Sequence, residues 1–114
     1  MENYSHDLDT AFHALSDPTR RAVVSRLMRG PAPVKELAQP FGMGLPSFLK
    51  HLKILEESGL IISSKEGRVR TCEVRAERLT ALERWFDEQR AIWESRYEKL
   101  DGLLMNLRGE KDEL

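Results

Sequence analysis

The chain has 114 residues, a length that fits one compact domain with a single hydrophobic core. Hydrophobic residues make up 40% of it and charged residues 32%, a balance that argues against disorder, and no apolar run approaches the roughly 18 residues of a membrane-spanning helix. The N-terminus is polar and acidic, unlike a signal peptide, and a single cysteine suits a reducing compartment. We therefore expect a cytoplasmic protein with no membrane partner.

The charge is unevenly distributed along the chain. Residues 1–44 carry no net charge, residues 45–78 carry +2 and residues 79–114 carry −3, against −1 for the whole chain. Taken alone, a pI near 6.3 argues against binding to nucleic acid, because DNA-binding domains are often strongly basic. The positive middle third supports a local binding surface only weakly, since ordinary solvated charge would give similar numbers.

Two helices are predicted at the start of the chain. Apolar residues at spacings of three and four predict a helix over residues 8–15. Asp17 is a good N-cap and Pro18 suits the first position of a second helix, whose apolar pattern continues to about Arg29. Residues 30–33, one glycine and two prolines among them, then break the pattern.

The next segment predicts a helix-turn-helix unit. We expect a short helix over residues 34–40 and a turn over residues 41–44 that contains two glycines. A further helix over about residues 45–58 buries Phe48, Leu52 and Leu55 on one face, and Gly59 is placed to cap its end. Two helices joined by a short Gly-containing turn form the unit that many DNA-binding proteins use.

After Gly59 the periodicity changes from that of helices to that of strands. Residues 60–65 predict one strand, Glu66-Gly67 a turn, and residues 68–74 a second strand that alternates polar and apolar side chains. A hairpin directly after a helix-turn-helix unit is a wing. Residues 1–78 therefore predict a mainly α-helical, winged helix-turn-helix DNA-binding region with a small β-hairpin.

Residues 76–107 predict one long helix. They contain no proline, and at about 1.5 Å per residue they span about 48 Å, more than a domain of this size can cover with its own body. Their apolar residues recur at spacings of three, four and multiples of seven, a coiled-coil-like stripe that usually packs against a partner. We therefore expect residues 79–114 to be a dimerisation helix within the same single domain.

Four segments carry a more specific signal: ALSDPTRR at residues 14–21, VKELA at 34–38, HLKILEESGLI at 51–61 and EGR at 66–68. Together, and in this order and spacing, they resemble the ArsR (arsenic-repressor-like) family of transcriptional regulators. The resemblance covers roughly residues 8–78. It implies a homodimeric repressor of its own or a neighbouring operon, bound to a palindromic operator in double-stranded DNA. It also implies a dimer interface made by the first and last helices, with candidates Leu8, Phe12, Leu82, Phe86, Trp93, Tyr97, Leu100 and Leu104.

The sequence departs from the metal-sensing members of that family. Those members carry a Cys-x-Cys pair in the third helix, where this chain has Val34-Lys35-Glu36-Leu37-Ala38-Gln39. Others place Asp and His ligands in the last helix, which here has no His or Cys, and the three histidines are expected to lie in three different elements. A zinc site needs several nitrogen or sulfur ligands that converge on one ion. The chain therefore resembles a metal-free branch, and we expect no metal site and no cofactor.

The fourth helix would be the recognition helix in the major groove. Its polar residues and those of the wing are the candidates for contacts with base edges and phosphates, although each of them could also be a solvated surface residue. For Arg20 and Arg21 the sequence allows two roles, a local ion pair or a contact with a DNA phosphate. The DNA-binding candidates are Ser47, Lys50, His51, Lys53, Lys65, Arg68 and Arg70.

Leu45 and Leu49 are unusual for a recognition helix. Either they contact thymine methyl groups, or Leu49 packs beside Met43 or Leu45 and never meets DNA. Cys72 is expected to be a small buried residue of the wing rather than a redox switch, which would need an exposed thiolate of low pKa.

Two other classes of function compete with a DNA-binding regulator. The pI and the two leucines suit a winged-helix protein-interaction module that has lost its role in DNA binding. An enzyme fits least, because there is no Gly-rich phosphate loop, no nucleophile–base spacing and no cluster of carboxylates. The sequence does not identify an effector, and a small apolar ligand near Trp85 and Trp93, thiol chemistry at Cys72 and the absence of any effector all remain open.

Overall fold

The computed structural model describes residues 2–113, and the side chains of residues 6–109. Part of the polar N-terminal segment interpreted above, Met1 and the side chains of residues 2–5, lies outside that description. The chain divides into two units, Met1–Leu82 and Glu83–Leu114.

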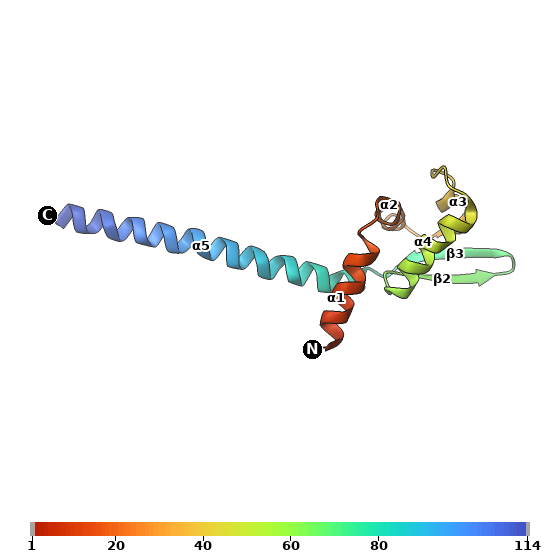
Figure 1. The fold of residues 1–114 in the computed structure, drawn as a ribbon, viewed down its shortest axis with the longest axis horizontal. Coiled ribbons are helices and arrows are strands. Elements are labelled where there is room, and N and C mark those ends of the chain that lie inside the picture. Colours follow the sequence, from red (N-terminus) through yellow and green to blue (C-terminus); the bar gives the residue numbers. More distant parts are fainter. Residues whose placement is uncertain (1, 114) are drawn as a thin grey trace. The chain divides into compact units, whose positions relative to one another are not determined.

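The first unit begins with two helices, α1 (Glu2–Ala14) and α2 (Pro18–Leu27) (Figure 1). The start of α1 was predicted too late, because residues 2–7 are polar and the apolar periodicity that marks a helix face appears only from Leu8. The predicted N-cap of α2 is confirmed, since the Asp17 carboxylate accepts a hydrogen bond from the backbone N–H of Arg20 at 3.1 Å. The tight Ser16-Asp17-Pro18 connection thus fixes where one helix ends and the other begins.

The helix-turn-helix unit consists of α3 (Val34–Ala38) and α4 (Leu45–Glu57). Gly59 ends α4 with a positive φ of 80°, a conformation that costs glycine little. Its N–H donates to the Glu56 carbonyl at 3.0 Å, and the N–H of Leu60 donates to the Leu55 carbonyl at 3.2 Å. These two bonds are the Schellman pattern, and they confirm the predicted cap.

The wing is a hairpin of β2 (Ile61–Glu66) and β3 (Val69–Val74), which lies beside α4 in Figure 1. Glu66 pairs with Val69, so the turn has two central residues, and the first of them, Gly67, has a φ of 63°. A positive φ at the first central position alone is the geometry of a type II′ turn, which matches the twist of the flanking strands. The two central residues are therefore Gly67 and Arg68, one residue later than the predicted Glu66-Gly67.

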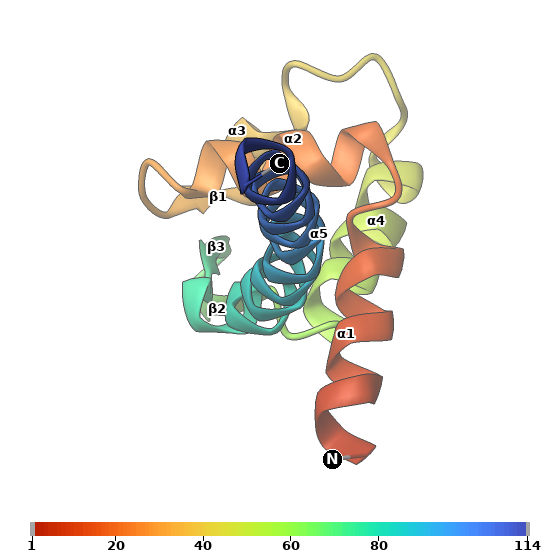
Figure 2. The same cartoon turned by 90° about the vertical axis from the view of Figure 1, so that its left-hand side faces the viewer.

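A third strand, β1 (Ala32–Pro33), is present where the sequence predicts only a break between helices. It pairs antiparallel with β3, Ala32 opposite Cys72 and Pro33 opposite Thr71, in a sheet of order β1-β3-β2 (Figure 2). The Gly-Pro-Ala-Pro sequence was interpreted as a break, because proline lacks the N–H that most strand positions use. An edge position, however, accommodates proline.

The core of this unit joins all of these elements. Phe48, Leu52 and Leu55 of α4 are fully buried, as predicted, and Phe41 stacks on Phe48 with ring centroids 5.6 Å apart. The other members of this core cluster come from every layer, namely Ala14, Val23, Val24, Leu27, Ala32, Leu37, Leu60, Ile61 and Cys72. The recognition helix therefore rests on a continuous apolar base that the helices and the sheet supply together.

The predicted long helix starts as a separate short turn. Residues Ala76–Leu79 form a 3-10 helix, η1, and α5 follows over Thr80–Glu113, so the helix begins later and ends later than expected. Within the second unit α5 carries Trp93 in edge-to-face contact with Tyr97. Among residues 2–113, no helix is both long enough and apolar enough to cross a membrane.

Candidate nucleic-acid interface

The exposed face of α4 carries two lysines, Lys50 and Lys53, and one carboxylate, Glu57, which lies 4.0 Å from Lys53 at the end of the helix. With Phe48, Leu52 and Leu55 buried, the 100° step of a helix turns Lys50 directly away from the core and places Lys53 and Ser47 to either side of it. All three side chains are exposed. The local fold therefore presents these candidates to solvent on one helix face.

The wing adds a second cationic group. Arg68, the second central residue of the turn, and Lys65, near the end of β2, are both exposed. Arg70 is engaged instead: its guanidinium forms a short ion pair with Glu56 of α4 and donates from Nε to the Ser63 hydroxyl at 3.1 Å. Ser63 in turn donates to Glu56 at 2.9 Å. Arg70 thus ties the wing to the recognition helix, and its predicted phosphate contact stays a prediction.

A hollow of about 1010 Å³ lies between α3, the start of α4 and the wing. Its lining has no acidic residue, although the chain as a whole carries a net charge of −1. It consists of Pro33, Val34, Lys35, Ala38, Leu45, Leu49, Ser63, Ser64, Lys65, Arg68, Val69 and Arg70. Four basic side chains around an apolar floor favour an anionic occupant.

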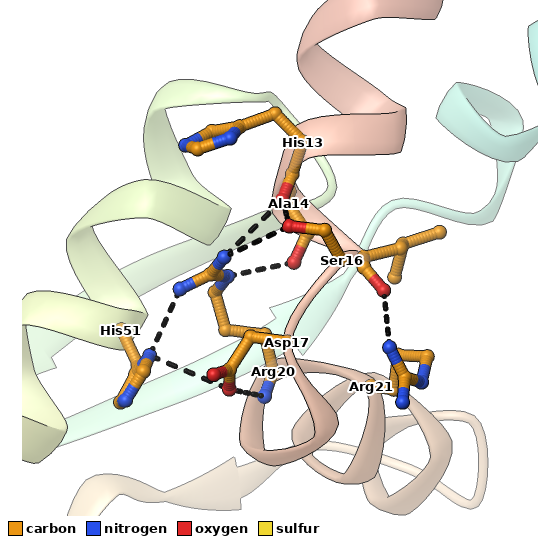
Figure 3. A network of polar contacts seen from close by, with 8 residues as sticks. His13, Ala14, Ser16, Asp17, Arg20, Arg21 and His51 are labelled. Atoms are coloured by element: carbon orange, nitrogen blue, oxygen red, sulfur yellow. Dashed lines mark hydrogen bonds and ion pairs between the residues drawn. The ribbon is translucent and has the colours of Figure 1, made fainter.

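Polar contacts also hold the other flank of α4. Figure 3 shows Arg20 of α2 between the end of α1 and His51 of α4. Its Nη1 lies 3.0 Å from Nδ1 of His51, its Nε donates to the Ala14 carbonyl at 2.7 Å and its Nη2 donates to the His13 carbonyl at 3.2 Å. Those two carbonyls are among the last four of α1, which have no partner within the helix. Arg20 therefore caps α1 and positions α4 at once.

His51 is partly buried in this network rather than turned to solvent. The Asp17 carboxylate lies 3.7 Å from Nδ1 of His51. Partial burial raises the pKa of Asp17, but the hydrogen bond from the Arg20 backbone and the nearby His51 and Arg20 charges outweigh it, so the pKa is lowered on balance. These contacts give His51 a positioning role, and its predicted contact with DNA stays a prediction.

Arg20 and Arg21 make local contacts in the structure. Arg21 donates to the Leu15 carbonyl at 2.8 Å and is exposed, whereas Arg20 is only 6% exposed. The sequence alone does not decide whether these two residues have a local role or a DNA-binding role. The signal that could have separated them is the preceding Asp-Pro, which reverses the chain so sharply that the next side chains reach back to the end of α1.

Leu45 and Leu49 are exposed on α4, with 53% and 36% of their surfaces accessible, and both line the hollow. Cys72 is fully buried, as predicted. Its burial and the neighbouring Glu56 carboxylate raise the pKa of its thiol, against a smaller opposite effect of Arg70. In the part of the chain that the structure describes, no three His, Cys, Asp or Glu side chains group as metal ligands.

The candidates for a dimer interface differ in exposure. In α5 a set of apolar side chains lies within a sector of about 80° at 100° per residue. Each is about half exposed: Phe86, Trp93, Tyr97, Leu100, Leu104 and Leu107. Leu82 differs from them, because it is only 6% exposed within the single chain and so offers little surface to a partner.

Comparisons with known proteins agree with this architecture. Residues 15–63 match a helix-turn-helix domain family. The chain is 39% identical over 74 residues to the HTH-type transcriptional regulator Rv2034 of Mycobacterium tuberculosis, over 65% of this chain and 69% of that protein. It is 33% identical over 61 residues to the transcriptional repressor SdpR of Bacillus subtilis, over 54% of this chain and 68% of that one. A crystal structure of an ArsR family transcriptional regulator is 57% identical, with a TM-score of 0.76 over 80% of this chain and 94% of that one.

Proposed function

Because this chain belongs to the ArsR family of DNA-binding transcriptional regulators, we propose that it is a homodimeric repressor that binds a palindromic operator of its own or a neighbouring operon. Residues 1–78 are the DNA-binding region and residues 79–114 the dimerisation helix of one functional domain. The name of the similar Bacillus subtilis protein, a transcriptional repressor, supports the direction of regulation.

The observation that carries this proposal is the cationic surface shared by α4 and the wing. Lys50, Lys53, Lys65 and Arg68 are exposed there, and the hollow between the two elements has no acidic lining residue. The phosphate backbone needs such a surface, and each neutralised phosphate releases counterions, which makes affinity fall with salt. Ser47 is exposed on the same helix face, and a serine hydroxyl can donate to a phosphate or a base edge.

Binding to promoter DNA tests the proposal. Fluorescence anisotropy with the upstream region of the chain's own gene, measured across a salt series from about 50 mM, should show affinity that falls steeply with salt. Substituting Lys50→Ala together with Arg68→Ala should weaken binding and reduce the salt slope by about 2 per protomer. The matched control is Arg29→Ala with Lys99→Ala, which removes the same two charges from exposed positions outside α4 and the wing. Wild-type protein that does not bind at low salt would refute the proposal.

Dimerisation through α5 is a separate part of the proposal. The half-exposed stripe that includes Trp93, Leu100 and Leu104 supports it, because a helix with such a stripe gains by packing it against a second copy. Sedimentation velocity at micromolar concentration should give a dimer, and Leu100→Asp should shift it to monomer. Met105→Asp is the matched control, since Met105 is 71% exposed and lies about 120° around the helix from Trp93. A monomeric wild type, or equal effects of the two substitutions, would contradict this part.

The proposal requires neither a metal ion nor a catalytic step. Family membership favours regulation over catalysis. The second candidate is a protein-interaction module, which the exposed Leu45 and Leu49 favour. The Lys50→Ala and Arg68→Ala variant separates the two. A DNA-binding regulator should lose affinity for DNA, whereas a pure interaction module binds no DNA and should be unaffected.

A further inference from the structure

The recognition helix has an apolar flank that the proposed phosphate contacts do not use. Leu45 and Leu49 lie one turn apart, and the hollow that they line continues to Val69 of the wing. Resting on the proposed function, we infer that Leu45 and Leu49 read the C5-methyl groups of thymines in the major groove of the operator. They are therefore specificity-determining residues of this protein.

The position of the two leucines on α4 supports this inference. At 100° per residue they lie about 50–90° from the centre of the buried face, on the side of Glu56. Glu56 marks the flank that faces the wing, because it pairs with Arg70 and Ser63 there. Leu45 and Leu49 thus stand between the cationic outer face of α4 and the wing.

Packing within the chain leaves much of the surface of Leu45 and Leu49 accessible. Leu45 keeps 53% of its surface accessible and Leu49 keeps 36%, whereas Leu52, one turn on from Phe48, is fully buried. The alternative that Leu49 is sequestered beside Met43 or Leu45 would leave little of it accessible. The two leucines therefore retain surface with which to contact an occupant of the hollow.

The chemistry of the surroundings identifies the occupant. Lys35, Lys65 and Arg68 line the same hollow and no acidic residue does, so the occupant is anionic on its outside and apolar where it meets the leucines. Duplex DNA has this combination, since the thymine methyl is the apolar group that base edges present in the major groove. A leucine cannot accept or donate a hydrogen bond, so it distinguishes thymine by the methyl alone.

Replacing operator thymines one at a time by deoxyuridine tests the inference, because this change removes only the C5-methyl. The operator is first delimited by footprinting with the wild-type protein, and affinities are then measured by anisotropy at fixed salt. We expect one or two positions in each half-site at which the change weakens wild-type binding, by about four-fold for each buried methyl. Leu49→Ala should bind the thymine operator more weakly and should lose its sensitivity to deoxyuridine at one of those positions.

The controls keep the possible failures apart. Met28→Ala also shortens an exposed apolar side chain, at the end of α2, and should keep the full sensitivity of the wild type. Wild-type binding that is indifferent to deoxyuridine at every thymine would overturn the inference and leave the proposed function standing, with a protein partner or a small apolar ligand as the occupant. Absence of wild-type binding to any promoter fragment would defeat the proposed function itself. A Leu49→Ala variant that remains as sensitive as the wild type at every position would assign the methyl contact to other residues and overturn the role of Leu49.

Discussion

Removal of the Arg20 side chain should destabilise the protein far more than removal of its neighbour Arg21. Arg20 is 6% exposed and links three helices, because it extends from α2 to the last carbonyls of α1 and to His51 of α4. The Arg20→Ala substitution removes the side-chain donor of the Ala14 carbonyl. Because Ala14 is fully buried, water cannot easily replace that donor. It also releases His51 from its 3.0 Å contact.

The expected loss follows from the individual contacts. The Nε bond to the Ala14 carbonyl at 2.7 Å and the Nη1 contact with His51 at 3.0 Å are the two short ones, and hydrogen bonds to charged groups are worth about 1.5–3 kcal/mol each. The Nη2 contacts with the His13 carbonyl at 3.2 Å and the Ser16 hydroxyl at 3.5 Å are longer and partly exposed, so they add little. Water that enters the space replaces part of the lost bonding, and we expect a net loss of about 2–4 kcal/mol in the free energy of unfolding.

Urea denaturation followed by circular dichroism measures this loss. All variants are compared at one protomer concentration, since the stability of a dimer depends on it. Arg21→Ala is the matched control: it removes the same side chain one residue later, where one exposed hydrogen bond to the Leu15 carbonyl is lost, and should cost less than about 1 kcal/mol. An Arg20→Ala loss no larger than that of Arg21→Ala would refute the assignment of Arg20 as the link between the helices.

Three further predictions concern the same unit. The lowered pKa of Asp17 means that its carboxylate stabilises the folded state above the unfolded pKa near 3.8, and that this contribution disappears as the pH falls through the lower folded pKa. Wild-type stability should therefore fall more steeply below pH 4 than that of Asp17→Asn, which keeps an N-cap without the charge, and equal pH dependence in urea titrations would contradict this. Cys72 has a raised pKa and is fully buried, so an aromatic disulfide reagent at pH 8 should label the folded protein much more slowly than the urea-unfolded chain; equal rates would disprove the burial. Leu52→Ala should cost about 2–5 kcal/mol in unfolding free energy, whereas Leu49→Ala should cost less than about 1 kcal/mol, and a comparable cost for both would mean that Leu49 belongs to the core.

The helices and the wing were predictable because local signals mark them. Asp17-Pro18 begins α2, Gly59 ends α4 and Gly67 turns the hairpin, and each acts through a backbone preference that needs no tertiary context. The strand β1 was missed because it is defined only by its partner: two residues that contain a proline become a strand when β3 lies alongside. Pairing of this kind has no periodicity to detect.

The candidate site was predictable by residue type but not by contact. The helix period predicted that Phe48, Leu52 and Leu55 are buried and that Lys50 lies on the opposite face, since both follow from the 100° step of one helix. The sequence could not show that His51 meets Arg20 or that Arg70 meets Glu56, because those partners lie 31 and 14 residues apart along the chain. Which cation is free and which is paired depends on the tertiary fold.

These two pairings have a common effect on the recognition helix. His51 fixes one flank of α4 to Arg20, and Glu56 fixes the other flank to the wing through Arg70. A helix that is held on both flanks and buried at its base presents its outer face at a defined angle, which favours shape-specific binding because little reorientation is required. The basic side chains left exposed are then Lys50, Lys53, Lys65 and Arg68, although Lys53 also lies 4.0 Å from Glu57 in a solvent-exposed ion pair. His51 and Arg70, by contrast, would have to leave partly buried contacts to meet a phosphate. Substitution of any of those four residues should accordingly reduce the salt dependence of DNA binding. In an Arg70→Ala variant we expect the wing to lose its fixed orientation, with a smaller change in the salt dependence of binding.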